Sequence, residues 1–191
     1  EERPARLVVF TFDDGYLDTF TEARGILEGQ GWRATVFCCP GLMAADAPRV
    51  EERWGAALMS RSQVLELAAA GWEIGGHTIS HPNLPAIPLA DKREEVVGGK
   101  RMLEDLLGSA VRTFAYPRGL HDAESLGLVA EAGFLCAVGT AKGNRHRPEE
   151  RFCLRRVFVR PDTQGWRLAH RLGWLYDCHH RLRQALGLES V

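Results

Sequence analysis

Short apolar runs alternate along the chain with longer stretches in which apolar residues recur at helical spacing. Runs rich in β-branched and aromatic residues predict strands at residues 7–12, 34–38, 72–75, 113–116, 135–138 and 154–159. Helical spacing follows Asp18 and covers residues 62–70, 91–107 and 123–132. Strands that alternate with helices are typical of parallel strands joined by crossover helices. The pattern therefore predicts an α/β fold.

The last part of the chain has a different pattern. Residues 165–186 carry leucines at helical spacing, with arginines and three histidines between them. We expect a C-terminal helix packed on the core. A basic amphipathic helix also suits contact with a membrane surface or a partner protein, and these alternatives stay open. Because no linker or repeat divides the sequence, we expect one domain over residues 1–191, with a core at about 6–160.

Composition narrows the function classes. The chain of 191 residues has 24 Lys plus Arg and 25 Asp plus Glu, a net charge of −1, so nothing favours nucleic acid as a partner. Its five cysteines form no CxxC pair, which argues against a zinc finger and favours reduced thiols. Reduced thiols slightly favour the cytoplasm. A removed leader would instead place the protein in the periplasm or outside the cell. Composition does not indicate an oligomeric state.

The first chemical motif is Thr-Phe-Asp-Asp-Gly at residues 11–15. It follows the first predicted strand, and active sites in parallel α/β folds lie at the carboxyl ends of strands. Neighbouring side chains can serve separate roles where a strand ends and bends. One carboxylate could bind a metal while the other acts as a base. The alternative is an ordinary turn with solvated carboxylates.

The second motif is His-Thr-Ile-Ser-His at residues 77–81, directly after another predicted strand. Two imidazoles four residues apart on one helical turn can share a metal ion, and Pro82 limits the helix to a single turn. Two histidines and a carboxylate with open positions are the ligand set of a catalytic metal site. The alternative is a pair of histidines held only by hydrogen bonds.

Together these motifs resemble the polysaccharide deacetylase family, also called carbohydrate esterase family 4. The resemblance covers residues 7 to about 159 and includes the segments 34–37, 68–75 and 114–119. The last of these, Phe-Ala-Tyr-Pro-Arg-Gly, resembles a variant found in deacetylases of exopolysaccharide loci.

This resemblance implies a distorted, incomplete (β/α) barrel of about seven strands of the polysaccharide deacetylase type. It implies a metal-dependent hydrolase that removes N-acetyl groups from an N-acetylated sugar polymer or oligomer. Two alternatives are a deacetylase or deformylase of a lipid-linked or small sugar precursor, and a sugar-binding relative with weak catalysis.

The resemblance also implies roles for the motif residues. Asp13 is expected to be the catalytic base, and Asp14, His77 and His81 are expected to hold a divalent metal. Zinc is favoured, with cobalt, nickel, manganese and iron as alternatives. The base would take the proton of the water that attacks the N-acetyl carbonyl.

A third segment differs from the family's commonest pattern. Ala115 stands where an arginine usually orients the base, and we expect Arg156 to supply the guanidinium beside Asp13, with Arg155 as the competing candidate. The main-chain N–H of Arg118 is expected to help hold the oxyanion.

Substrate contacts and the general acid are less well indicated. Tyr116, Pro117 and Trp54 are candidate sugar contacts, with Trp54 on a rim loop over residues 44–59. The family's usual general-acid histidine has no clear counterpart. His170 and His121 are weak candidates, and the alternative is that the base itself protonates the leaving amine.

Overall fold

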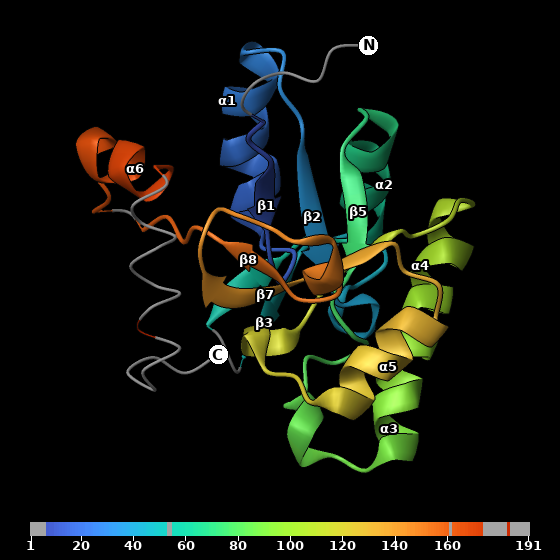
Figure 1. Ribbon diagram of the computed structural model, residues 1–191. Helices are drawn as coiled ribbons and strands as arrows, with labels where there is room; N and C mark the ends of the chain where they lie inside the picture. Colours follow the sequence, from blue (N-terminus) through green and yellow to red (C-terminus); the bar gives the residue numbers. More distant parts are fainter. Residues whose placement is uncertain (1–6, 53–54, 161, 174–182, 184–191) are drawn as a thin grey trace. The chain divides into compact units, whose positions relative to one another are not determined.

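The computed structural model describes residues 7–52, 55–160, 162–173 and 183 (Figure 1). The chain divides into two compact units, which we describe separately. Unit 1 comprises Glu1–His81 and Glu94–Val111, and unit 2 comprises Pro82–Arg93 and Arg112–Val191.

Unit 1 is built on three parallel strands. β1 (Phe10–Phe12), β2 (Ala34–Cys38) and β5 (Glu73–Gly76) lie side by side in that order (Figure 1). The central strand β2 is buried along its whole length, as its continuous apolar run predicts. Cys38 pairs with Gly76, the last residue of β5. Parallel strands end at one edge, so the residues after β1 and β5 emerge together.

Among the helical elements of unit 1, α2 (Arg61–Ala69) begins with a side-chain cap. These elements are a π-helical turn (Thr19–Ala23), α1 (Arg24–Gly29), a 3₁₀ turn (Pro40–Leu42), α2, a π-helical turn (Glu94–Gly98) and α4 (Gly99–Leu107). At the start of α2, the Ser60 hydroxyl accepts from the Gln63 N–H at 3.3 Å, and the Gln63 side chain accepts from the Ser60 N–H at 3.0 Å. This reciprocal pair is a capping box.

Residues 44–59, expected as a rim loop, contain a short hairpin. Within them, β3 (Arg49–Glu51) pairs with β4 (Ala56–Leu58) in an antiparallel hairpin. Leu58 is buried and forms a bridge with Tyr16, which anchors the hairpin beside the first motif. The strands are too short to give a clear alternating pattern in the sequence. Trp54, the candidate sugar contact, lies outside the described residues.

Unit 2 also has three parallel strands: β6 (Thr113–Ala115), β7 (Cys136–Lys142) and β8 (Leu154–Arg156). Its helical elements are α3 (Leu89–Arg93), α5 (Ala123–Glu131), α6 (Gly165–Arg171) and 3₁₀ turns at Leu84–Ala86, Pro117–Gly119 and Pro148–Glu150. The buried Lys92 joins α3 to α5: its Nζ donates to Asp122 at 2.5 Å and to Glu124 at 2.6 Å.

The predicted elements match the observed ones best where a run is buried. β2 has the bounds predicted for it, whereas β1 begins only at Phe10, after the exposed residues 7–9. The described residues of each unit form three parallel strands, six in all against the seven or so expected, and unit 1 adds the antiparallel pair β3 and β4. Of the predicted C-terminal helix, the structure describes α6, whose Trp166 is exposed, and most of residues 174–191 lie outside the described part. No helix among the described residues is long and apolar enough to cross a membrane.

Candidate active site

Three side chains of unit 1 converge as the two motifs predicted. Asp14 follows β1, and His77 and His81 follow β5. Asp14 Oδ1 lies 3.2 Å from His77 Nε2 and 3.3 Å from His81 Nε2. The two imidazole rings are tilted by 60° with their centroids 5.0 Å apart, so they approach the carboxylate from different directions. Asp14 Oδ1 therefore faces the Nε2 atoms of two histidines that lie some sixty residues further along the chain.

These distances suit a shared metal ion. Ligand atoms bound at about 2.0–2.1 Å to a tetrahedral ion lie about 3.3–3.4 Å from one another. The two measured oxygen–nitrogen distances are close to that separation. The three residues also form a group whose ligand atoms all lie within 4.8 Å of one another.

The hydrogen bonding of Asp14 gives a second, independent indication. Its Oδ1 is buried and accepts no hydrogen bond from any described residue, although both Nε2 atoms are close to it. A buried oxygen without a hydrogen-bond donor costs about 1–3 kcal/mol. A cation bound by the oxygen and both nitrogens would remove that cost, so the residues present fit a divalent metal.

The backbone around these side chains is strained. Asp14, Thr78 and His81 have φ values of 69°, 65° and 59°, in the left-handed region that costs most residues about 1–2 kcal/mol. Such conformations persist where the surroundings hold them and are concentrated at functional sites. The expectation of one helical turn at residues 77–81 is therefore wrong. The histidines lie in an irregular loop, and the left-handed residues bring their rings together.

Hydrogen bonds from neighbouring side chains hold the histidine loop. The carbonyl of His77 accepts from Cys39 Sγ at 2.9 Å and from Thr78 Oγ1 at 2.5 Å, and the His77 N–H donates to the carbonyl of Cys38 at 3.0 Å. Thr78 Oγ1 also accepts from the His81 N–H at 3.0 Å. These supporting roles are not visible in the sequence, because a cysteine at the end of an apolar strand has the pattern of a core residue.

The surroundings of Asp14 keep other acidic groups neutral. Burial, together with the negative charge of Asp14, raises the pKa of the Cys38 thiol to about 12. Burial also raises the pKa of Tyr16, with further contributions from the charge of Asp14 and a hydrogen bond to it. Asp14 is the carboxylate member of the three-ligand group. Asp13, half-buried directly after β1, is not a member of that group.

The third segment forms a tight turn in unit 2. Arg118 is exposed and has a φ of 57°, which interrupts the Pro117–Gly119 turn. Gly119 has a φ of 72°, and a Cβ there would lie 2.0 Å from Thr140 Oγ1 and 2.6 Å from Thr140 N. Only glycine fits this position without displacing the backbone of β7.

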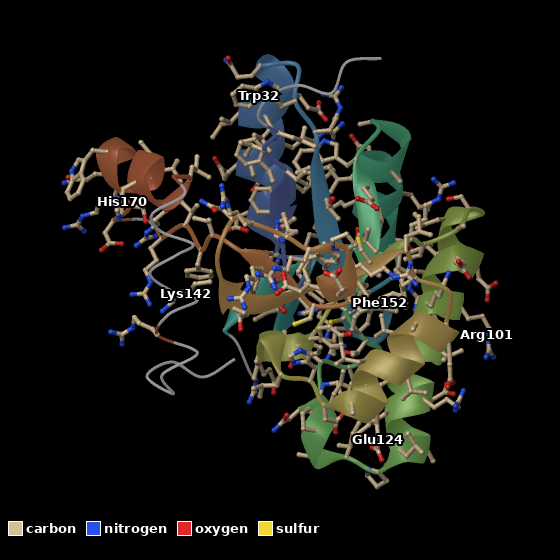
Figure 2. The ribbon with its side chains drawn as sticks, in the orientation of Figure 1. Trp32, Arg101, Glu124, Lys142, Phe152 and His170 are labelled. Carbon is tan, nitrogen blue, oxygen red and sulfur yellow. The ribbon has the colours of Figure 1, made fainter. Side chains whose placement is uncertain are left out.

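Tyr116 does not have the exposure expected of a sugar contact. Its side chain is fully buried and packs edge-on against Phe114. Its hydroxyl donates to the carbonyl of Phe152 at 3.0 Å (Phe152 in Figure 2). Pro117 is buried as well. Both residues therefore anchor the turn, and we no longer assign either to stacking on a sugar.

Arg156 is held within unit 2. It is half-buried on β8, and its Nε donates to the carbonyl of Gly139 on β7 at 2.9 Å. The competing Arg155 donates from Nη1 to the carbonyl of Lys142 at a longer 3.3 Å. The role of Arg156 beside Asp13 stays a prediction.

The two candidate general acids have different surroundings. His121 Nε2 lies 2.8 Å from Cys153 Sγ, its ring lies 4.9 Å from that of Tyr116, and burial lowers its pKa. His170 is exposed on α6 (Figure 2). A half-buried imidazole with a lowered pKa is a poor proton donor near neutral pH. Neither environment identifies a general acid.

Comparison with known proteins agrees with the motifs and the fold. The sequence profile of the family described as polysaccharide deacetylase matches residues 1–137. The chain belongs to the polysaccharide deacetylase family. The putative polysaccharide deacetylase YxkH of Bacillus subtilis is 27% identical over 166 residues, which are 86% of this chain and 56% of YxkH. The chitooligosaccharide deacetylase of Sinorhizobium fredii is 32% identical over 133 residues, which are 69% of this chain and 55% of that protein.

The solved structure of a related deacetylase has the same fold as this chain. The deacetylase PplD of Streptococcus pyogenes, in complex with acetate, superimposes with a TM-score of 0.79 at 26% identity, covering 90% of this chain and 73% of PplD. The predicted fold class, a distorted (β/α) barrel of the polysaccharide deacetylase type, is thereby confirmed. The chain spans just over half the length of the two curated relatives.

Proposed function

We propose that this chain is a metal-dependent hydrolase that removes N-acetyl groups from an N-acetylated sugar polymer or oligomer. The observation that carries the proposal is the Asp14–His77–His81 group, in which a buried carboxylate oxygen faces two imidazole nitrogens and accepts no hydrogen bond from a described residue. Family membership supports the same chemistry, since one relative is a chitooligosaccharide deacetylase and another binds acetate, the product that such a reaction releases.

In this proposal Asp14, His77 and His81 would hold the metal, with zinc favoured by the mixed nitrogen and oxygen ligands. A metal so bound supplies Lewis-acid chemistry: it polarises a carbonyl and makes water acidic enough to attack near neutral pH. Asp14 is engaged as a ligand, so its neighbour Asp13 is the carboxylate that can accept a proton. Two adjacent acids thereby take two roles.

Asp13 would take the proton of the attacking water and return it to the amine as the carbon–nitrogen bond breaks. The main-chain N–H of Arg118 is proposed to donate to the carbonyl oxygen as it gains negative charge, a contribution of about 3 kcal/mol for one such donor. A guanidinium from Arg156 is proposed to keep the base ionised.

The test is release of acetate from chitooligosaccharides and from β-1,6-linked N-acetylglucosamine oligomers. We expect a chelator to abolish release, and zinc or cobalt to restore it. Asp13→Asn should retain metal binding and lower kcat by about 10²–10⁴-fold, as expected for loss of a general base. The control is Asp105→Asn, an exposed carboxylate on α4, which should change neither. Full activity in the chelator, or in Asp13→Asn, would contradict the proposal.

A further inference from the structure

One carboxylate from outside both motifs holds the loop between the two histidines. Glu95 Oε2 accepts from the N–H of Ile79 at 2.8 Å and from the N–H of Ser80 at 2.9 Å. Its other oxygen, Oε1, accepts from the Ser80 hydroxyl at 2.6 Å. Hydrogen bonds to an ionised acceptor are about twice as strong as neutral ones. A single side chain thus fixes two consecutive peptide groups of the loop.

The local backbone brings Glu95 to the loop. Glu95 lies in the π-helical turn Glu94–Gly98, which leads into α4. A Cβ at Gly99, the first residue of α4, would lie 3.1 Å from the carbonyl carbon of Thr78 and 3.2 Å from the nitrogen of Ile79. The missing side chain therefore lets the start of α4 lie against the loop. Single π-helical turns within helices are frequent at functional sites.

The loop is held from its other side as well. The carbonyl of Ile79 accepts from the N–H of Gly41 at 3.0 Å, and a Cβ at Gly41 would lie 2.6 Å from the Ile79 side chain. Ile79 is thus fixed through both its N–H and its carbonyl. The two residues with positive φ, Thr78 and His81, stand on either side of the segment that Glu95 binds. Strained residues keep their conformation only where their surroundings determine it.

We infer that Glu95 is a positioning residue: its carboxylate fixes the Ile79–Ser80 peptides, and thereby presents His77 and His81 to the metal. It touches neither imidazole and acts through the backbone between them. The inference rests on the proposed metal site. Groups that orient ligands from outside the coordination shell typically change metal affinity by about 10–100-fold when removed.

The experiment is titration of metal-free protein with Co²⁺, followed by visible absorption, with far-UV circular dichroism and the apparent Tm of the metal-free protein measured alongside. Glu95→Ala should raise the Kd for Co²⁺ by about 10–100-fold. Glu95→Gln should stay within about 3-fold of wild type, because its amide oxygen can accept both N–H groups and its NH₂ can donate to Ser80. The matched control is Glu94→Ala, an exposed carboxylate on the same turn, with an unchanged Kd.

A merely structural role gives a different result. If Glu95→Ala lowers the Tm but leaves the Kd within about 3-fold of wild type, below the range expected for an orienting group, the inference is overturned. If Glu95→Ala does not fold, Ser80→Ala decides, since it removes the hydroxyl that donates to Oε1 and keeps the backbone N–H that donates to Oε2. A Kd raised by about 3–10-fold then supports the inference, and an unchanged Kd overturns it. A wild-type protein that binds no Co²⁺ would overturn the proposed metal site itself.

Discussion

Asp14→Asn is expected to change the stability of the metal-free and the metal-bound protein in opposite directions. Asparagine has the size of aspartate and tolerates the left-handed backbone equally well, so the strain at this position cancels in the comparison. The carboxylate oxygen that lacks a donor is replaced by an amide, whose NH₂ can donate to an imidazole nitrogen. The comparison is made at pH 8, above the ordinary pKa of an imidazole.

The magnitude follows from the burial of that oxygen. A buried acceptor without a partner costs about 1–3 kcal/mol, and the Asp14 side chain retains 20% exposure, which favours the lower half of that range. We expect metal-free Asp14→Asn to be about 1–2 kcal/mol more stable than metal-free wild type. For a chain of this size each kcal/mol raises Tm by about 2–4 °C.

Metal reverses the order. At a zinc concentration about 100 times its Kd, the wild-type protein gains about 2.7 kcal/mol, whereas the variant lacks the anionic ligand and gains little. Thermal unfolding in EDTA and in zinc, followed by circular dichroism, measures both differences. Asp105→Asn is the control and should keep the wild-type response in both conditions. An Asp14→Asn protein less stable than wild type in EDTA, or one still stabilised by zinc, would refute the reasoning.

Two further predictions concern unit 2. Gly119→Ala should lower the free energy of unfolding by about 2–5 kcal/mol, because the new Cβ would clash with Thr140 and the φ of residue 119 is positive. The control is Gly127→Ala on the open face of α5, which should raise the free energy of unfolding by up to about 1 kcal/mol. Urea unfolding measures both variants, and equal effects would contradict the clash. Burial would raise the pKa of Asp122, but hydrogen bonds from Lys92 and Ser125 lower it to about 2. The stabilising contribution of Asp122 is therefore present above about pH 4 and lost as the pH falls toward 2. Asp122→Ala should be less stable than wild type at neutral pH, by about 1 kcal/mol for the lost helix cap, and its free energy of unfolding should fall less on acidification. Urea unfolding from pH 7 to pH 2 measures this, and the same fall in both proteins would contradict the prediction.

Periodicity predicted the elements that bury a continuous apolar run, and failed where packing determined the structure. The run at residues 34–38 is the central strand of unit 1 and has the bounds predicted for it. The hairpin of β3 and β4 was missed because its strands have three residues each, too few for an alternating pattern. β7 continues beyond its apolar run to Lys142, since pairing with β8 sustains it.

The two strand-end motifs indicated one carboxylate and two histidines as candidate metal ligands, because parallel strands end at one edge, and the family resemblance gave that role to Asp14 rather than Asp13. In the structure the ligand atoms of Asp14, His77 and His81 lie within 4.8 Å of one another. Tyr116 was a candidate sugar contact because it lies within the third segment, and its full burial argues against that role. A sequence shows that a residue has an aromatic ring but not which way the ring points.

The amino-acid sequence by itself determined the order of strands and helices, the family and the chemical types at the site. Only the tertiary structure decided how those groups meet. The histidine loop is held by residues outside its motif: the Cys39 thiol donates to the carbonyl of His77, and the Glu95 carboxylate accepts from the N–H groups of Ile79 and Ser80. His81 also has a left-handed backbone conformation that the sequence does not indicate. Propensity and periodicity are local properties of the chain, whereas a hydrogen bond between distant segments depends on register and close approach, which exist only once the chain has packed.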